Sequence, residues 1–382
     1  MRGITLILML FVNDLYMPGV PSWLGHMKAD FDGMGLADWV FPGFLFMVGM
    51  SIPYSIGKRI SQGEDNSLIS RHIALRTVSL LIIGVLMMNT GRVEPVLTGM
   101  SQNLWALLMY FGVFLVWNDY KEKGNFFTIL NFRLLGMALL TFLVFKFRSG
   151  QPENEGSIII GWWGILGLIG WGYFVSAFIY LFIRDNIINT LVAFLFFLCL
   201  NILTKLNFLT FLDPVRPFLG VILEGNVPMI VLAGLLTTLI LRKYQDNQQR
   251  MLATLLVVAS ASILMGFIIR HWIIISKIRA TPSWGLICNG ISIVLFCLLY
   301  YITDIRKITS WAGFIKPAGQ NSLTTYLAPD ILYYLIWMSG VPVLIYKHST
   351  EPLVVIAGSL VWSLLMVGVT ALLVRIGIRL KL

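Results

Sequence analysis

The sequence predicts an all-α fold, a polytopic integral membrane bundle of about 11 to 12 transmembrane helices. Of the 382 residues, 58% are hydrophobic and only 12% are charged, and the mean hydropathy is +0.83. A soluble domain carries about 25% charged residues, so this amount of charge cannot cover a soluble surface. The apolar residues also form runs of about 18 to 24, the length that crosses a bilayer.

Twelve apolar runs mark the expected spans in chain order. They cover residues 2–17, 39–60, 70–90, 102–117, 128–147, 159–183, 187–204, 226–242, 251–273, 284–303, 319–340 and 353–376. The first run reaches Asn13 and Asp14 too early to cross about 30 Å, so this polar pair is expected near a helix end that lines a cavity. A cleaved signal peptide is the alternative for that run. The runs at 187–204 and 226–242 are the weakest, and a smaller number of spans remains open.

The distribution of positive charge predicts the orientation. With the N-terminus in the cytoplasm, 18 of the 28 Lys and Arg residues fall on the cytoplasmic side. They are Arg2, Lys58, Arg59, Arg71, Arg76, Lys121, Lys123, Arg133, Arg184, Arg242, Lys243, Arg250, Arg306, Lys307, Lys316, Arg375, Arg379 and Lys381. Both termini are therefore expected in the cytoplasm. The net charge of +10 then reflects topology and anionic membrane lipid rather than nucleic acid.

A polar cluster lies immediately before the second expected span. Its members are His26, Lys28, Asp30, Asp32 and Asp38, and Asn13 and Asp14 end the preceding run on the same side. An imidazole beside a carboxylate is suited to general base catalysis, because the acid fixes the tautomer of the ring. The alternative is a solvated loop with a salt bridge, in which Asp38 caps the helix.

A second polar group opens the eleventh expected span. Asn321, Ser322, Thr325 and Tyr326 share one helical face there, which indicates either a ligand contact or hydrogen bonds between helices. The four histidines form no HxxxH or HExxH pattern, so no metal site is expected. The three cysteines all lie in apolar runs, which excludes a disulfide framework.

Several motifs across the chain resemble heparan-alpha-glucosaminide N-acetyltransferase and its bacterial relatives. In the first part they are Arg2-Gly3-Ile4-Thr5, Phe11-Val12-Asn13, Phe31-Asp32-Gly33, Ala37-Asp38-Trp39-Val40-Phe41-Pro42 and Gly49-Met50-Ser51-Ile52. In the second part they are Lys277 with Thr281-Pro282-Ser283-Trp284, Tyr300-Tyr301 with Asp304, and Gly319-Gln320-Asn321-Ser322 with Tyr326.

This resemblance implies one transmembrane acyltransferase domain over residues 1–382, with a catalytic-region half at 1–150 and a C-terminal helical half at 151–382. The protein would move acetyl from cytoplasmic acetyl-CoA to a sugar, an amino sugar or glycan, on the periplasmic side of a bacterial inner membrane. The large outer N-terminal domain of the animal enzyme has no counterpart in this sequence. The family position of the histidine falls on Lys28, and His26, the only imidazole in the loop, is assigned its role.

The resemblance also implies the roles of individual residues. Catalytic roles fall on His26, Asn13 and Asp38. Sugar binding is expected from Asp14, Asp30, Asp32, Asn321, Ser322, Tyr326 and Lys277. The phosphates of coenzyme A are expected at Arg76, Arg71, Lys58 and Arg59, with no metal; Arg76 lies deeper in its run than Arg71 and is expected to contribute more.

The sequence leaves other interpretations open. A secondary transporter of a small polar or anionic solute would also have many spans, but it predicts inverted repeats that the sequence does not show. A lipid-binding assembly protein would leave the His26 loop without a role. N- or O-acetylation, an acetyl-histidine intermediate or direct transfer, and a homodimer are likewise undecided.

Overall fold

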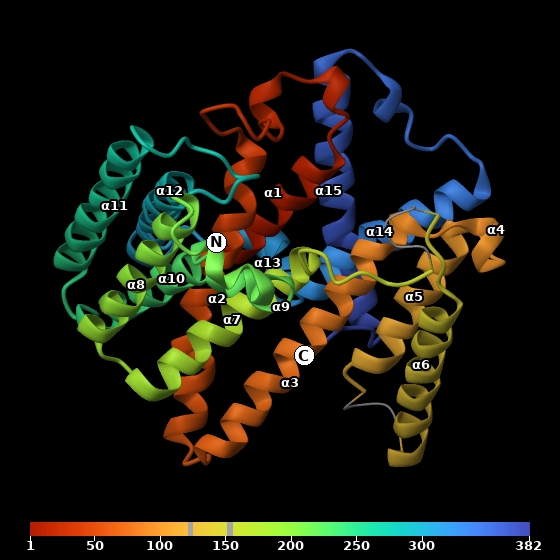
Figure 1. The fold of residues 1–382 in the computed structure, drawn as a ribbon, viewed down its shortest axis with the longest axis horizontal. Coiled ribbons are helices and arrows are strands. Elements are labelled where there is room, and N and C mark those ends of the chain that lie inside the picture. The colour runs from red at the N-terminus through yellow and green to blue at the C-terminus, as the bar shows by residue number, and fades with distance from the viewer. Residues whose placement is uncertain (121–124, 151–155) are drawn as a thin grey trace. The chain divides into compact units, whose positions relative to one another are not determined.

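The computed structural model describes residues 1–120, 125–150 and 156–382. Within these ranges the chain is helical, and the only extended pairings are isolated bridges (Figure 1). The predicted all-α, multi-pass membrane fold is therefore confirmed. Lys121 and Lys123, which the charge pattern assigns to the cytoplasmic side, lie outside the described residues.

The helices follow the apolar runs in order. They are α1 (Arg2–Asp14), α2 (Leu36–Ser61), α3 (Asn66–Asn89), α4 (Pro95–Thr98), α5 (Gln102–Trp117), α6 (Phe126–Lys146), α7 (Gly164–Ile183), α8 (Ile187–Lys205), α9 (Arg216–Leu223), α10 (Asn226–Lys243), α11 (Gln248–Arg270), α12 (Pro282–Tyr300), α13 (Ala312–Gln320), α14 (Ser322–Ser339) and α15 (Pro352–Arg375). Short 3-10 turns connect several of them, and a π-helical turn at Tyr301–Ile305 ends α12.

Nine helical segments in the described part of the chain are long and apolar enough to cross a membrane. They contain α2, α3, α6, α7, α8, α10, α11, α12 and α15, and the segment with α10 begins at Thr210. The other three predicted spans coincide with α1, α5 and α14, of which α1 has 13 residues and α5 has 16. At 1.5 Å per residue α1 is about 20 Å long, so it ends inside the span of a bilayer.

The chain forms two compact units, each assembled from three segments. Unit 1 contains Met1–Thr5, Pro21–Val78 and Leu168–Gly313, and unit 2 contains Leu6–Val20, Ser79–Gly167 and Phe314–Leu382. Each unit thus draws on both halves of the sequence.

Unit 1 is built around α10, whose residues are almost all buried. A β-carbon at Gly49 of α2 would approach the carbonyl of Val231 to 1.8 Å, and one at Gly234 of α10 would approach that of Phe46 to 1.9 Å. These two glycines therefore allow the α2 and α10 backbones to touch. Thr238 fixes the same contact by donating to the Met50 carbonyl at 3.0 Å.

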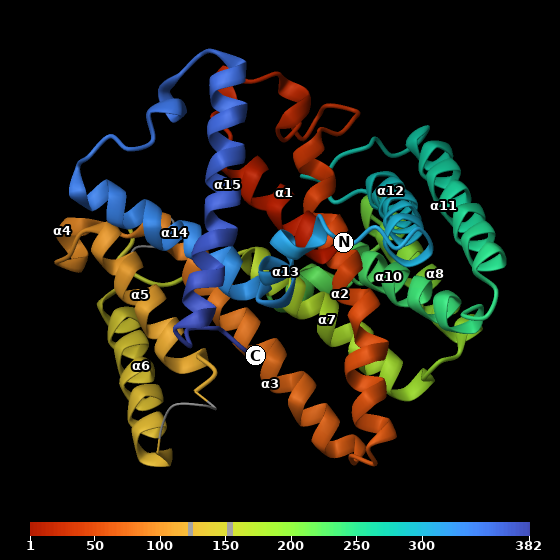
Figure 2. The ribbon, with the colours of Figure 1, turned by 180° about the vertical axis from the view of Figure 1, so that it is seen from behind.

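Several helices of unit 1 carry apolar side chains on their outer surface. On α11 these include Val257, Leu264 and Ile268, which are 51% to 69% exposed. Figures 1 and 2 show α11 beside α12, its main packing partner. An outward apolar face of this kind is stable only against lipid, as expected for a membrane bundle.

In unit 2, a buried carboxylate fastens the end of α1. Asp14 is the last residue of α1 and is 2% exposed. It accepts hydrogen bonds from the hydroxyls of Tyr333 on α14 and Tyr346, the latter at 2.7 Å, and pairs with the Lys347 ammonium at 2.8 Å. That ammonium also lies 4.1 Å from the centroid of the Tyr333 ring. Both carboxylate oxygens of Asp14 are thus engaged by α14 and by the connection from α14 to α15.

We expect Asp14→Asn to lower the stability of the protein by about 2–4 kcal/mol, because it removes the only anion that neutralises Lys347 among these contacts. Thermal melting in detergent measures the effect. Asp213→Asn is the matched control, since Asp213 is 58% exposed in its pair with Arg216 and should contribute below about 1 kcal/mol. Equal melting temperatures for the two variants would show that the Asp14 cluster does not hold the fold.

Candidate active site

The first turn of α2 buries a carboxylate at one end of unit 1. Asp38 is the third residue of the helix and is 1% exposed. Its Oδ2 accepts hydrogen bonds from the backbone N–H groups of Gly35 at 2.9 Å and Met27 at 3.1 Å. Its Oδ1 lies 2.8 Å from Nδ1 of His26. Asp38 therefore does cap the helix start, and the same carboxylate also orients the imidazole.

This contact decides which nitrogen of His26 is free. An ionised carboxylate only accepts hydrogen bonds, so Nδ1 carries the proton that faces Asp38. In the neutral ring, Nε2 then holds a lone pair. The His26 side chain is 47% exposed, so the ring is open to solvent, and the Lys277 Nζ lies 3.3 Å from Nε2. A fixed tautomer on an exposed ring is suited to a general base.

Lys277 joins the pair from a distant part of the sequence. Its Nζ lies 3.0 Å from Nδ1 and 3.3 Å from Nε2 of His26, so the ammonium stands beside the ring. Burial lowers the pKa of Lys277, and the Asp38 charge opposes that effect. The site therefore combines a carboxylate, an imidazole and a half-buried ammonium within hydrogen-bond reach.

Lys277 reaches this position because two loops are hydrogen-bonded along their length. Asp32 accepts the Ile275 N–H at 2.8 Å and pairs with Arg270 at 2.8 Å. The Ile275 carbonyl in turn accepts the N–H of Gly33 at 3.0 Å. Ser276 donates to the Ala29 carbonyl at 2.9 Å. An ion pair between Asp30 and Arg279 also joins these two loops.

Two buried asparagines form hydrogen bonds to the loop that carries Lys277. Asn201 on α8 donates to the Ala280 carbonyl at 3.1 Å, and Asn226 on α10 donates to the Thr281 carbonyl at 3.0 Å. Ala280 has a φ of +47°, a conformation that L-residues adopt at a cost. The two amides are placed to hold this turn in its strained form, which fixes the position of Lys277.

The helix start is held equally closely. The Trp284 indole of α12 donates to the Asp38 carbonyl at 3.1 Å, and Trp39 donates to Ser292 at 3.2 Å. A β-carbon at Gly35 would lie 2.2 Å from the carbonyl of Gly25, so only glycine fits there.

The structure groups the predicted site residues in two sets. His26, Asp38, Lys277, Asp30 and Asp32 come together in unit 1, where the last two hold the loops. Asn13, Asp14, Asn321, Ser322 and Tyr326 belong to unit 2. Asn13 is exposed at the end of α1, and Asn321 and Ser322 bond to carbonyls of the preceding turn.

The predicted coenzyme A residues differ in their surroundings. Arg71 is exposed, and Arg59 pairs with Glu64 at 2.7 Å. Arg76 is half-buried, with its guanidinium 4.5 Å from the centroid of the Tyr173 ring. Its Nε is buried and has no hydrogen-bond partner. A buried, incompletely paired cation favours binding of an anion.

Lys58 lines a polar pocket of about 730 Å³ at the other end of α2. Arg184 and Arg242 also line it, with one carboxylate, Asp185. Arg242 donates to the Pro53 carbonyl at 2.8 Å and pairs with Asp185 at 3.1 Å.

Arg184 stands out in this pocket for two reasons. It has a φ of +60°, and its buried Nη1 lacks a hydrogen-bond partner, although Nη2 donates to Asn66 at 2.9 Å. The charge pattern of the sequence assigns Arg184 and Arg242 only to the cytoplasmic side. The feature of the sequence that could have predicted this pocket is that Lys58, Arg184 and Arg242 each end an apolar run on that side.

No group of three His, Cys, Asp or Glu side chains in residues 1–120, 125–150 and 156–382 is arranged to hold a metal ion.

Comparison with known proteins gives two kinds of similarity. Over 88 residues, 23% of the chain, it is 39% identical to human (Homo sapiens) and 35% identical to mouse (Mus musculus) heparan-alpha-glucosaminide N-acetyltransferase. The matched stretch spans only 13% of the length of each of these curated relatives. A family model described as a domain of unknown function, DUF5009, matches residues 1–205, more than half of the 382 residues. The chain therefore belongs to the DUF5009 family, and it resembles the acetyltransferases over a shorter stretch.

Proposed function

We propose that this protein is a transmembrane acetyltransferase that moves acetyl from cytoplasmic acetyl-CoA to an amino sugar or glycan on the opposite face of the membrane. The observation that carries the proposal is the Asp38, His26 and Lys277 arrangement at one end of unit 1. The 88-residue similarity to proteins named acetyltransferases supports the same chemistry.

The three side chains suit the steps of acyl transfer. Nε2 of His26 takes the proton as the amine or hydroxyl of the acceptor attacks the thioester carbonyl. Lys277 faces the region where the oxyanion develops and supplies positive charge there. When the C–S bond breaks, the imidazolium returns its proton to the departing thiolate. The products are the acetylated acceptor and the free thiol of coenzyme A.

A second route uses the same nitrogen. Nε2 can attack the thioester itself, which forms an acetyl-imidazolium and breaks the C–S bond to release the thiolate. The acceptor then attacks the acetyl group, the C–N bond to Nε2 breaks, and the proton of the acceptor passes to the thiolate. Asp38 supports either route, because it holds the ring with Nε2 outward and stabilises its positive charge.

Contacts between α7, α10 and α2 relate Arg76 to positions along the axis of α2. Gly172 of α7 packs against Val231 of α10, and Val231 faces Gly49 of α2. The Arg76 guanidinium lies 4.5 Å from the ring centroid of Tyr173, the next residue of α7, and the proposal therefore takes Arg76 to lie near the level of Gly49. Asp38 is 11 residues before Gly49 on α2, which corresponds to about 16 Å along the helix.

This spacing matches the acetyl carrier. The pantetheine arm has about thirteen bonds between phosphorus and sulfur and extends to about 16 Å at ordinary bond lengths. Phosphates held at Arg76 would therefore place the thioester near His26. Phosphates at Lys58, 20 residues from Asp38, would be about 30 Å away and would leave the thioester short of the site. The length of the pantetheine arm therefore favours Arg76 over Lys58 and Arg59 as the diphosphate ligand.

The polar pocket suits the nucleotide end of the same molecule. Tyr180 lines it and lies seven residues from Tyr173, about 10 Å along the same face of α7. The 3′-phosphate would be held by Arg184, Arg242 and Lys58, of which Arg184 has a free donor. In this arrangement coenzyme A enters from the cytoplasm, the sugar from the other face, and no sugar crosses the membrane.

The main test is replacement of the base. We expect His26→Ala to reduce acetyl transfer from labelled acetyl-CoA to amino sugars by about 10² to 10⁴-fold. The melting temperature should change little, because the side chain is 47% exposed and the Gly35 and Met27 N–H groups still bind the Asp38 carboxylate. His271→Ala is the matched control, since His271 is an exposed histidine outside the contacts of the site. Wild-type turnover in the His26 variant would rule out the proposed role of His26.

The lowered pKa of Lys277 predicts an unusual alkaline limit. As pH rises, Lys277 loses its proton earlier than an ordinary lysine, and oxyanion stabilisation is lost with it. Lys277→Arg keeps its charge, so the alkaline fall in kcat/KM should move to higher pH in that variant. Identical alkaline limits in both proteins would assign the fall to another group.

Arg76→Ala should weaken coenzyme A binding by at least about tenfold, because charge-assisted hydrogen bonds to a phosphate are lost. Arg71→Ala, five residues earlier on the same helix and exposed, should change the Kd by less than about threefold. Isothermal titration in detergent measures both. Equal effects would contradict the placement of the diphosphate at Arg76.

A further inference from the structure

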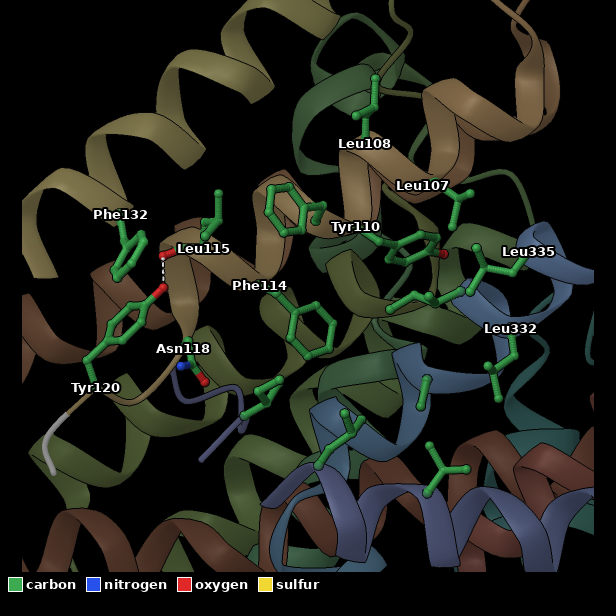
Figure 3. A pocket seen from close by; sticks show the side chains of 16 residues that line it. Leu107, Leu108, Tyr110, Phe114, Leu115, Asn118, Tyr120, Phe132, Leu332 and Leu335 are labelled. Carbon is green, nitrogen blue, oxygen red and sulfur yellow. Dashed lines mark hydrogen bonds between the residues drawn. The ribbon is translucent and has the colours of Figure 1, made fainter. Parts of the chain in front are cut away.

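An apolar groove of about 630 Å³ runs along unit 2 (Figure 3). It is lined from α5, α14 and α15, and its residues include Leu107, Phe111, Phe114, Leu332, Leu335 and Val369. This volume lies within the range of about 300–1,000 Å³ that holds drug-sized ligands. The groove residues belong to unit 2, whereas His26, Asp38 and Lys277 of the proposed acetyl-transfer site belong to unit 1.

The few polar groups in the lining are already hydrogen-bonded. The Tyr110 hydroxyl donates to Asp330 at 2.5 Å, and the Tyr120 hydroxyl donates to the Leu115 carbonyl at 2.9 Å. Asn118 donates to the Gly377 carbonyl at 3.3 Å and accepts the Arg379 N–H at 2.8 Å. A ligand in the groove would therefore contact apolar surface, and Tyr110, Tyr120 and Asn118 are already engaged in hydrogen bonds within the protein. This lining favours a hydrocarbon chain.

One end of the groove differs from the rest. Tyr120 stacks on Phe132 there, with ring centroids 5.8 Å apart, and Figure 3 shows both rings beside Asn118. An aromatic residue with a polar tip is typical of the membrane interface. This end of the groove is therefore suited to the headgroup level of a membrane.

Positive charge gathers at the same end. Arg379 pairs with Asp119 at 2.8 Å, and Lys381 lies 3.7 Å from the same carboxylate. Asp119 is buried, whereas the Arg379 and Lys381 side chains are 42% and 61% exposed. Among the described residues, these two cations share one carboxylate, so the three side chains together carry a net charge of +1. Arg375 lies four residues before Arg379, in the last turn of α15.

We propose that this groove is a binding site for an anionic phospholipid, with one acyl chain along α5 and α14 and the phosphate at Arg379 and Lys381. The apolar lining accounts for the chain, and the charge at the interfacial end accounts for the preference among headgroups. Arg375, Arg379 and Lys381 also belong to the predicted cytoplasmic side, where anionic lipid is concentrated.

The test measures binding of dioleoyl phosphatidylglycerol and dioleoyl phosphatidylcholine to the detergent-purified protein by native mass spectrometry. The wild type should bind one phosphatidylglycerol at least about fivefold more tightly than phosphatidylcholine, since each basic residue near an anionic surface contributes about that factor. Lys381→Gln should reduce the preference and leave phosphatidylcholine binding unchanged. Arg379 is left intact because its loss would leave the buried Asp119 without its closest cation.

A second variant tests the groove itself. Leu335 is 49% exposed within the lining, and Leu335→Trp should fill the groove and reduce lipid binding by at least about tenfold. Leu365→Trp, at a 56% exposed position of α15 outside the lining, is the matched control for added bulk. Unchanged lipid binding in Leu335→Trp, equal binding of the two lipids, or a doubled protein mass in place of bound lipid would overturn the proposal.

Discussion

The arrangement of the candidate active site in unit 1 depends on the buried carboxylate of Asp38. A charge that is 1% exposed is stable only when its oxygens are satisfied, and Gly35, Met27 and His26 supply the donors. The same contacts start α2, close the preceding loop and orient the imidazole. The positions of the helix, the loop and the base therefore follow from one local requirement.

The second constraint is the close contact of α2 with α10. Gly49 and Gly234 let the two backbones touch, so the helices keep a fixed register. Because the register is fixed, the number of residues between Asp38 and Gly49 on α2 gives the distance along the helix from Asp38 to the proposed level of Arg76. The proposal of Arg76 as the diphosphate ligand, in place of the cations nearer the end of α2, rests on this distance and on the length of the pantetheine arm.

Much of the fold could be predicted from the sequence, because membrane helices are encoded by local runs of apolar residues. Each predicted span coincides with a helix, and the polar pair Asn13 and Asp14 does mark the end of α1. The assignment of His26 and Asp38 to one cluster was also accessible, since only 12 residues separate them.

The remaining parts of the site depend on contacts between distant segments. Lys277 lies 251 residues from His26, and only the packing of two loops brings them together. Arg184 and Arg242 meet Lys58 because α7, α10 and α2 end at the same level. The engagement of Asp14 by Tyr333, Tyr346 and Lys347 likewise required the tertiary structure.

The proposed mechanism requires that acetyl crosses the membrane through the protein while the sugar does not. Its most direct measurement uses sealed liposomes containing the protein, with labelled acetyl-CoA on one side only and amino sugar on the other only. Protein molecules oriented with the Arg76 side toward acetyl-CoA should produce acetylated sugar in the sugar compartment, and His26→Ala liposomes should produce none. Product formed only when both substrates share one compartment would contradict transfer across the membrane.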